Sequence, residues 1–366
     1  MTGSPSSRSR LPLQQHWEND VNMVACAPER GELWRHAKVA RALGSPFVAA
    51  VLEAGERQLV RAPRTAALIR HWPGDLSQDA VAMRFNAALH ALARHGRLPA
   101  LSALYANQHD DFDGAIGGAM VAQDDVIALL MRDTPQTNEV GRSAAIAAAL
   151  MVAREQFGLP FELLEIGSSS GLNLNLAYHT YELGGVSAGV VRSSVKIAPT
   201  WMGADPPRAP IEIVTARGTD LNPLNPGDPH VRDRLLSYIW ADQPHRARRL
   251  ESALALALRH PPQVDHADAV TWLSARLDDG QAAGQCRVIF HSMVLQYLTE
   301  RDRHSITSTI RHAGARSTAD RPLAWISFEW TAMRDEVQLC LTCWPGGGTR
   351  LLATCHPYGE WIDWRL

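Results

Sequence analysis

The sequence has no long apolar run and few cysteines. None of its segments reaches the roughly 18 consecutive apolar residues that a membrane helix needs, so we expect no membrane partner. Five cysteines in 366 residues, an odd number, argue against a disulfide scaffold and for a reducing compartment. The first ten residues lack the apolar core of a secretory signal. We therefore expect a cytoplasmic protein with a disordered tail over residues 1–15.

The chain also lacks an excess of positive charge. Its 36 basic and 38 acidic residues give a net charge of −2, whereas a binder of nucleic acid or anionic membranes shows a basic excess. Only Lys38 and Lys196 are lysines, and the surplus of arginine is typical of GC-rich coding. We therefore expect a small-molecule substrate and no nucleic acid. The sequence does not indicate an oligomeric state.

A metal site is not expected either. Cys340 and Cys343 form a C-x-x-C pattern, but on a strand this odd spacing places the two side chains on opposite faces. No second cysteine pair or nearby histidine accompanies them, so the pattern does not favour zinc.

Hydrophobic periodicity divides the chain near residue 158. The length suggests about two structural units. Residues 16–157 read as an all-α domain, with a clear helical stripe over 79–95 that includes Val81, Phe85 and Leu89. Within it, 110–118 is expected to be a loop, and 124–130 a short helix.

Strands and helices alternate from residue 158 to residue 366. Short apolar runs at 161–166, 211–215, 263–267 and 286–291 predict strands, separated by helical segments that include 172–181 and 232–260. Three closing strands are expected at 322–330, 337–344 and 350–356. This order predicts an α/β fold: a doubly wound, mostly parallel sheet with an antiparallel edge.

A glycine-serine turn follows the first predicted strand, reading Glu-Ile-Gly-Ser-Ser-Ser-Gly from Glu165 to Gly171. In one interpretation Gly167 and Gly171 let a nucleotide-like cofactor approach the backbone, and Glu165 receives a cationic or donating group. In a second, the turn is a nucleophile elbow with Ser169 as nucleophile and His356 as base, although the strands and oxyanion loop that normally precede an elbow are missing. In a third, the small residues only allow a helix to pack closely on a strand.

Acidic residues recur at the ends of successive predicted strands: Glu165, Asp220 and Asp268. Ligands of doubly wound sheets bind outside the carboxyl ends of the strands, so the three acids together favour a single crevice. The alternative for each is helix N-capping, and for Asp268 taken alone capping is favoured.

Residues 161–366 resemble the class I S-adenosylmethionine-dependent methyltransferase fold. Leu-Leu-Glu-Ile-Gly-Ser-Ser-Ser-Gly at 163–171 resembles its first motif, although Ser-Ser-Ser replaces the glycine-rich centre. Gly-Thr-Asp-Leu-Asn-Pro at 218–223 resembles the turn whose acid binds the ribose hydroxyls, and Asp-Ala at 268–269 resembles the pair that meets adenine. The resemblance implies that S-adenosylmethionine is bound by Glu165, Gly167, Ser169, Gly171, Asp220, Asn222, Asp268 and Ala269.

Most of the chain is also similar to a bacterial family catalogued as a domain of unknown function. The similarity lies in Met-Arg-Phe at 83–85, Thr-Asn-Glu-Val-Gly-Arg-Ser at 137–143, Phe-His-Ser at 290–292 and His-Pro-Tyr-Gly at 356–359. It implies a helical cap domain over 16–157, a methyltransferase-like, Rossmann-like domain over 158–366 and no established substrate.

In the methyltransferase fold the loop after the fourth strand faces the transferred methyl group. Here that segment contains His291, a candidate general base, and Ser292, a candidate for orienting the substrate. A structural histidine at a strand end is the alternative for His291. The Asn/Asp-Pro-Pro-Tyr motif typical of base methylation is missing, which again disfavours nucleic acid.

Five further residues are candidates for the substrate side of the site. Three lie in one helical turn before the first strand, where they either reach the crevice or form a capping and ion-pair cluster. Two lie at the ends of closing strands. They are Asn138, Glu139 and Arg142, and then Glu329 and His356.

The favoured hypothesis is a methyltransferase acting on an unidentified small molecule. One alternative is a cofactor-binding or degenerate fold that serves protein interactions without transfer. The other is a serine hydrolase that uses Ser169.

Overall fold

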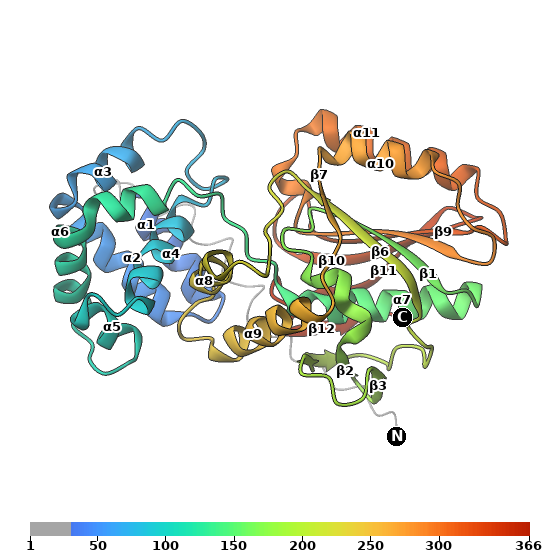
Figure 1. The fold of residues 1–366 in the computed structure, drawn as a ribbon, viewed down its shortest axis with the longest axis horizontal. Coiled ribbons are helices and arrows are strands. Elements are labelled where there is room, and N and C mark those ends of the chain that lie inside the picture. Colours follow the sequence, from blue (N-terminus) through green and yellow to red (C-terminus); the bar gives the residue numbers. More distant parts are fainter. Residues whose placement is uncertain (1–30) are drawn as a thin grey trace, which may run out of the picture.

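A computed structural model describes residues 31–366, so the predicted tail at 1–15 lies outside the described residues. The described chain forms a helical lobe and an α/β lobe, with two helices between them (Figure 1). The helical lobe consists of α1 (Glu32–Ala42), α2 (Pro46–Gln58), α3 (Pro63–Arg70), α4 (Val81–Arg94), α5 (Pro99–Tyr105) and α6 (Phe112–Leu130).

Apolar faces build the core of the helical lobe as the periodicity predicts. Val81, Phe85 and Leu89 of α4 are fully buried. Helix α2 approaches closely because residue 55 is glycine, and a Cβ there would lie 2.4 Å from the Phe85 ring. The loop expected at 110–118 is wrong, because α6 already begins at Phe112 and buries Ala115 and Ile116.

The α/β lobe contains a nine-stranded sheet in the order β5-β12-β11-β10-β9-β8-β1-β6-β7. Neighbouring strands from β7 to β9 run parallel, those from β9 to β12 antiparallel, and β5 pairs parallel with β12. The expected α/β class and mostly parallel sheet are confirmed. The strands are β1 (Phe161–Ile166), β5 (Thr200–Met202), β6 (Ile213–Asp220), β7 (Val264–His266), β8 (Cys286–Ser292), β9 (Leu323–Trp330), β10 (Val337–Trp344), β11 (Gly348–Cys355) and β12 (Trp361–Trp364).

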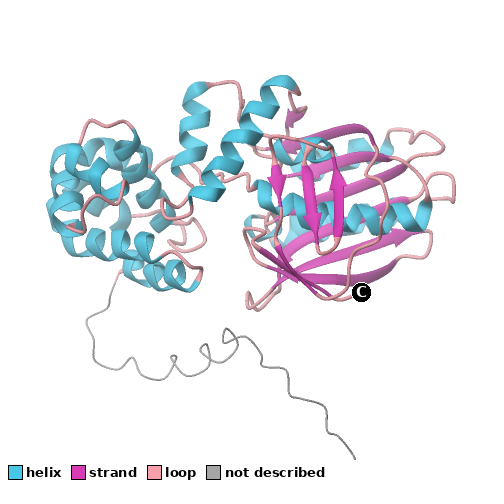
Figure 2. Cartoon of the chain, turned by 90° about the horizontal axis from the view of Figure 1, so that it is seen from below, coloured by secondary structure: helices cyan, strands magenta, loops and turns pink. Residues whose placement is uncertain are grey.

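Helices cover both faces of this sheet (Figure 2). Helices α10 (Ala269–Asp278) and α11 (Glu300–Ala315) cover one face, and α7 (Ser143–Phe157) covers the other. Helix α7 precedes the predicted boundary at 158, yet it packs on β9 and β10 with its residues 143–153 buried.

A small second sheet lies on the α7 side. The helix expected at 172–181 is wrong in its second half, because a 3-10 helix, η4 (Leu172–Tyr178), leads into strand β2 (Thr180–Leu183). This strand pairs with β3 (Val186–Gly189) and β4 (Lys196–Ile197).

Helices α8 (Pro229–Ser237) and α9 (Pro244–Arg259) connect the two lobes (Figure 1). The sequence predicted one long helical region at 232–260. Helix α8 packs on α4, and Trp240 joins the core of the helical lobe. Asp242, which follows α8, accepts hydrogen bonds from Ser45 Oγ at 2.6 Å and from the Phe47 amide at 3.1 Å, so the segment between α8 and α9 caps α2 of the helical lobe.

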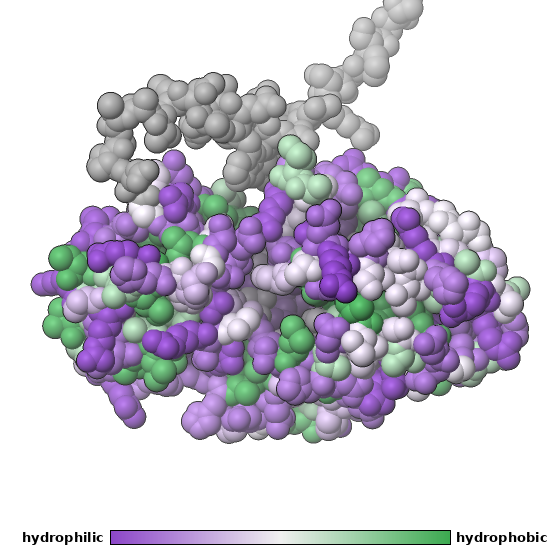
Figure 3. Space-filling view, turned by 90° about the horizontal axis from the view of Figure 1, so that it is seen from above, coloured by the Kyte–Doolittle hydropathy of each residue, from purple (hydrophilic) through white to green (hydrophobic). Residues whose placement is uncertain are grey.

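The carboxyl ends of the parallel strands face the helical lobe, and the surface is hollowed between the two lobes (Figure 3). Within residues 31–366, no helix combines the length and apolarity that a membrane crossing requires.

The capping role of Asp242 predicts that Asp242→Ala lowers stability. The substitution leaves the Phe47 amide and the Ser45 hydroxyl without their acceptor and removes a contact between the connecting segment and the helical lobe, so we expect a loss of about 1–2 kcal/mol in urea unfolding. The exposed Asp278→Ala serves as the control and should stay within about 0.5 kcal/mol of wild type. Equal effects of the two substitutions would contradict the capping role.

Candidate functional site

The glycine-serine turn after β1 has a backbone that favours glycine. Gly167, Ser169 and Gly171 all have positive φ, at 71°, 56° and 73°. A Cβ at residue 167 would lie 2.5 Å from Val294 Cγ2, and one at residue 171 would lie 2.6 Å from Pro262 Cβ. Both glycines therefore allow close packing within the protein as well as the turn itself.

Three polar side-chain atoms of this turn are buried without a partner. Glu165 is 2% exposed, and its Oε2 has no hydrogen-bond partner among the described residues. Ser169 Oγ and Asn173 Oδ1 are in the same situation. Burial raises the pKa of Glu165 to about 8, and the charge of Asp220 adds to the rise, while hydrogen bonding from Ser168 and Asn173 opposes it. Unpartnered buried polar groups are costly, so a hydrogen-bond donor placed beside Glu165 Oε2 would stabilise this part of the chain.

Asp220, at the end of β6, is by contrast fully engaged. Its carboxylate accepts hydrogen bonds from the Ser169 amide at 2.8 Å, the Asn222 amide at 2.8 Å and Gln136 Nε2 at 3.3 Å. The Asn222 carbonyl accepts a second bond from Gln136 Nε2 at 2.9 Å. A ribose bound here would have to share or replace these donors.

Asp268 caps a helix. Its Oδ1 accepts a hydrogen bond from the Thr271 amide at 3.0 Å, and Ala269 is the first residue of α10. The capping alternative therefore describes its observed contacts. The residue still lies at the same sheet edge as Asp220, because the neighbouring Ala267 amide donates to the Asp220 carbonyl at 3.2 Å.

The segment 136–142 crosses the carboxyl ends of three strands. Gln136 reaches β6, as described above. Asn138 Oδ1 accepts hydrogen bonds from Ser170 Oγ at 2.6 Å and from the Leu172 amide at 3.0 Å, beyond β1. Arg142 donates to the Ser292 carbonyl at 3.3 Å, at the end of β8, and to the Pro357 carbonyl at 2.8 Å.

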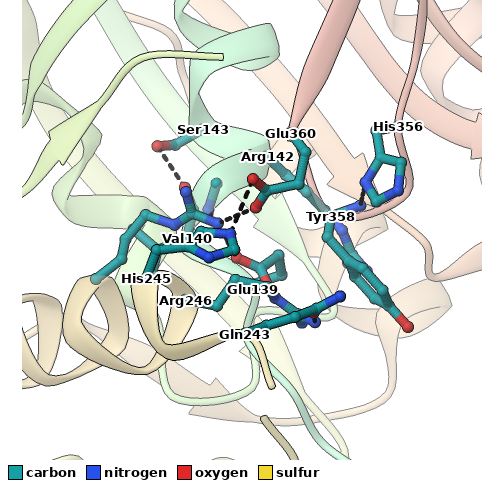
Figure 4. Close-up of polar contacts among 12 residues, drawn as sticks. Glu139, Val140, Arg142, Ser143, Gln243, His245, Arg246, His356, Tyr358 and Glu360 are labelled. Carbon is teal, nitrogen blue, oxygen red and sulfur yellow. Dashed lines mark hydrogen bonds and ion pairs between the residues drawn. The ribbon is translucent and has the colours of Figure 1, made fainter. Parts of the chain in front are cut away.

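A buried ion cluster fixes this segment (Figure 4). Glu139 accepts hydrogen bonds from Arg246 Nη2 at 2.6 Å and Arg249 Nη2 at 3.1 Å, and Arg249 also pairs with Glu360 at 2.9 Å. The Arg246 guanidinium lies 3.8 Å from the Tyr358 ring centroid. Burial opposes ionisation of Glu139, but the guanidinium groups outweigh it and lower the pKa to about 2.

His291 has no free ring nitrogen. The ring is fully buried, with Nδ1 2.7 Å from Glu329 Oε1 and Nε2 3.0 Å from Trp325 Nε1. An indole N–H only donates, so Nε2 is an acceptor and Nδ1 carries the proton that bonds to Glu329. These contacts match the structural alternative for His291. Ser292 contributes its carbonyl to Arg142.

His356 and Ser169 are not paired. His356 Nδ1 accepts a hydrogen bond from the Tyr358 amide at 3.2 Å, and burial lowers the pKa of His356 to about 4. Ser169 Oγ has no bonding partner within residues 31–366, so no base activates it in this conformation.

Residues 30–364 match the model of a protein family described as an uncharacterized protein conserved in bacteria, DUF2332. The chain belongs to the DUF2332 family. Membership confirms the expected bacterial family of unknown function. No curated protein and no solved structure matches the chain.

Sequence reasoning missed several groups at this DUF2332 site, notably Arg246 and Arg249. Arginines in a polar stretch suggest a solvated helix face. Their spacing from Leu250 and Ala253 nevertheless places Arg246 and Arg249 on the apolar side of α9, which was the available signal. Nothing local indicated the roles of Trp325 and Gln136.

The ion cluster predicts that Glu139→Gln costs about 3–5 kcal/mol at neutral pH, because it leaves the buried Arg246 guanidinium without a carboxylate and Arg249 with Glu360 alone. The folded pKa is depressed, so the stabilisation is complete above the unfolded pKa of about 4.3 and disappears as the pH falls toward 2. Urea unfolding at several pH values measures the difference between the two proteins. Glu360→Gln, at the exposed end of the cluster, should cost no more than about 1 kcal/mol. A difference that does not change between pH 6 and pH 2.5 would contradict this assignment.

The raised pKa of Glu165 predicts a pH dependence of stability opposite to that of Glu139. Its folded pKa is raised to about 8, so its burial is unfavourable above the unfolded pKa of about 4.3, and the penalty grows until the pH passes about 8. Glu165→Gln should therefore stabilise the protein by several kcal/mol at pH 8.5 and hardly at all at pH 4.5. Thermal unfolding at both pH values measures this, and destabilisation at pH 8.5 would refute it.

Proposed function

We propose that the carboxyl edge of β1 and β6 binds S-adenosylmethionine, and that this chain is a methyltransferase acting on a small molecule. The observation that carries the proposal is Glu165 Oε2, a buried carboxyl oxygen without a partner beside a turn of positive-φ residues. A bound amino or hydroxyl group would satisfy this oxygen. Ser169 Oγ, also unpartnered, lies on the same turn.

The sheet order supports a ligand at this place. In chain order, the parallel strands β1, β6, β7, β8 and β9 are arranged 3-2-1-4-5. Such a sheet has its switch point between β1 and β8, and ligands of doubly wound sheets bind outside that point. The Gly167 turn and the loop after β8 meet there, because Gly167 packs on Val294.

The chain's residues divide the binding tasks. Glu165 and Ser169 would receive donor groups of the cofactor, and Asp220 would hold ribose hydroxyls in place of some of its present donors. The cofactor supplies a methyl group on a positively charged sulfur, which an acceptor lone pair can take while the sulfur keeps the electrons of the broken bond. The segment 136–142 would shield the site from water.

Two alternatives make different predictions. A serine hydrolase needs a base beside Ser169, whose positive φ is compatible with an elbow but whose Oγ is unpartnered. Labelling of Ser169 by a fluorophosphonate probe would favour it. A degenerate interaction protein would bind the cofactor without transfer, or would not bind it.

Calorimetric titration with S-adenosylmethionine and S-adenosylhomocysteine tests the proposal. We expect micromolar binding to the wild type. Glu165→Gln should lose tenfold or more in affinity, because a cationic amino group would bind the ionised form of Glu165 and a neutral amide cannot form that charge-assisted bond. Glu155→Gln, at an exposed position of α7, should bind as the wild type does. Absence of heat and of a thermal shift at millimolar ligand would refute cofactor binding.

A further inference from the structure

Glu329 presents one open carboxyl oxygen at the switch point. Its Oε1 accepts hydrogen bonds from His291 Nδ1 at 2.7 Å, the Val294 amide at 2.9 Å and the Leu295 amide at 3.3 Å. Its Oε2 has no partner in the described chain and is not among the buried unpartnered atoms. The side chain is 10% exposed, and Oε2 is therefore the carboxyl oxygen left open to a further donor.

The surroundings of Glu329 place it next to the proposed cofactor turn. Glu329 lies near the carboxyl end of β9, and the amide that it binds belongs to Val294. The side chain of Val294 packs against Gly167, whose Cβ, if present, would lie 2.5 Å away. Val294 therefore lies between the Glu329 carboxyl group and the glycine-serine turn, in contact with both.

The orientation of the Glu329 carboxyl group is fixed by His291. Trp325 donates to His291 Nε2 at 3.0 Å, which leaves the His291 Nδ1 proton to bond with Glu329. With both nitrogens engaged and the ring fully buried, His291 cannot meet a substrate. It is a positioning residue that acts through Glu329.

The loop that carries Val294 is held on its other side by Arg142. Arg142 donates to the Ser292 carbonyl and to the Pro357 carbonyl, and Glu329 is one of the charges that act on its guanidinium. Met293, between the two contacts, has a φ of 60° and is 5% exposed. Arg142 therefore holds this loop at Ser292, and Glu329 holds it at the Val294 amide. The same amide contact fixes the Glu329 carboxyl group, so Oε2 keeps its position.

We infer that Glu329 binds the amino group of the methyl acceptor, so that the acceptor is a small amine. The inference rests on the proposed function. Glu329 Oε2 accepts an N–H bond from the ammonium group and then takes one of its protons, which leaves a lone pair on nitrogen. That lone pair forms the new N–C bond, the S–C bond breaks with its electrons remaining on sulfur, and Glu329 returns the proton to water.

Sinefungin tests this inference without a known acceptor. It is a cofactor analogue in which an amine-bearing carbon replaces the methyl-bearing sulfur, so its amine lies where the reacting groups meet. We expect wild type to bind sinefungin about tenfold more tightly than S-adenosylhomocysteine, in line with a charge-assisted hydrogen bond. Glu329→Gln should reduce that ratio to about one without changing the affinity for S-adenosylhomocysteine. Glu300→Gln, at the exposed first residue of α11, should keep the wild-type ratio.

The binding results distinguish a failure of cofactor binding from a failure of the role of Glu329. If wild type binds neither ligand, the proposed function fails and this inference fails with it. If S-adenosylhomocysteine binds but Glu329→Gln leaves the ratio unchanged, or weakens both ligands equally, the role of Glu329 alone is overturned. The positioning role of His291 has its own readout, since nitrogen NMR of the labelled protein should show a neutral ring protonated at Nδ1. A ring protonated at Nε2 would overturn that role.

Discussion

The buried pairing of Glu139 with Arg246 and Arg249 is the interaction on which the arrangement of the molecule depends. It joins the segment before α7 to α9 and, through Arg249 and Glu360, to the loop before β12. Removing these charges from water costs several kcal/mol each, and their mutual contacts, together with the Gly141 amide and the Tyr358 ring, offset that cost. The cluster therefore favours one position of the segment 136–142 over others. From that position the segment reaches the ends of β6, β1 and β8.

The carboxyl edge combines groups that are satisfied with groups that are not. Asp220 and Asn138 use the chain's own donors to hold the glycine-serine turn. Glu165, at the end of β1 where this turn begins, keeps an unpartnered oxygen. A protein that only needed a stable turn would place an apolar or amide side chain at Glu165. Retaining a poorly solvated carboxyl group lowers stability, which is a common property of binding sites.

The sequence predicted the elements whose signal is local. Alternating strands and helices after residue 158 and the stripe of α4 depend on periodicity, and both are present. The start of α6 was missed because glycine and aspartate suggested a loop, and the 3-10 helix η4 was read as an α-helix because the two patterns are similar over seven residues. Positions at strand ends were accessible from sequence, but hydrogen-bond partners were not. The engagement of both nitrogens of His291 depends on Trp325 and Glu329 of another strand.

The return of α8 to the helical lobe affects the order in which the molecule can be completed during synthesis. The hydroxyl of Ser45 donates to Asp242, which is synthesised 197 residues later. The hydrophobic core around α4 also includes Trp240 and Tyr358 from the later part of the chain. At bacterial translation rates this separation corresponds to roughly 10–40 seconds. During that interval the surface of α4 that later meets α8, and the start of α2 that later meets Asp242, face solvent or a chaperone. The helical lobe is synthesised first, but its core is complete only after the later residues have been synthesised. The two lobes therefore cannot complete their folding one after the other.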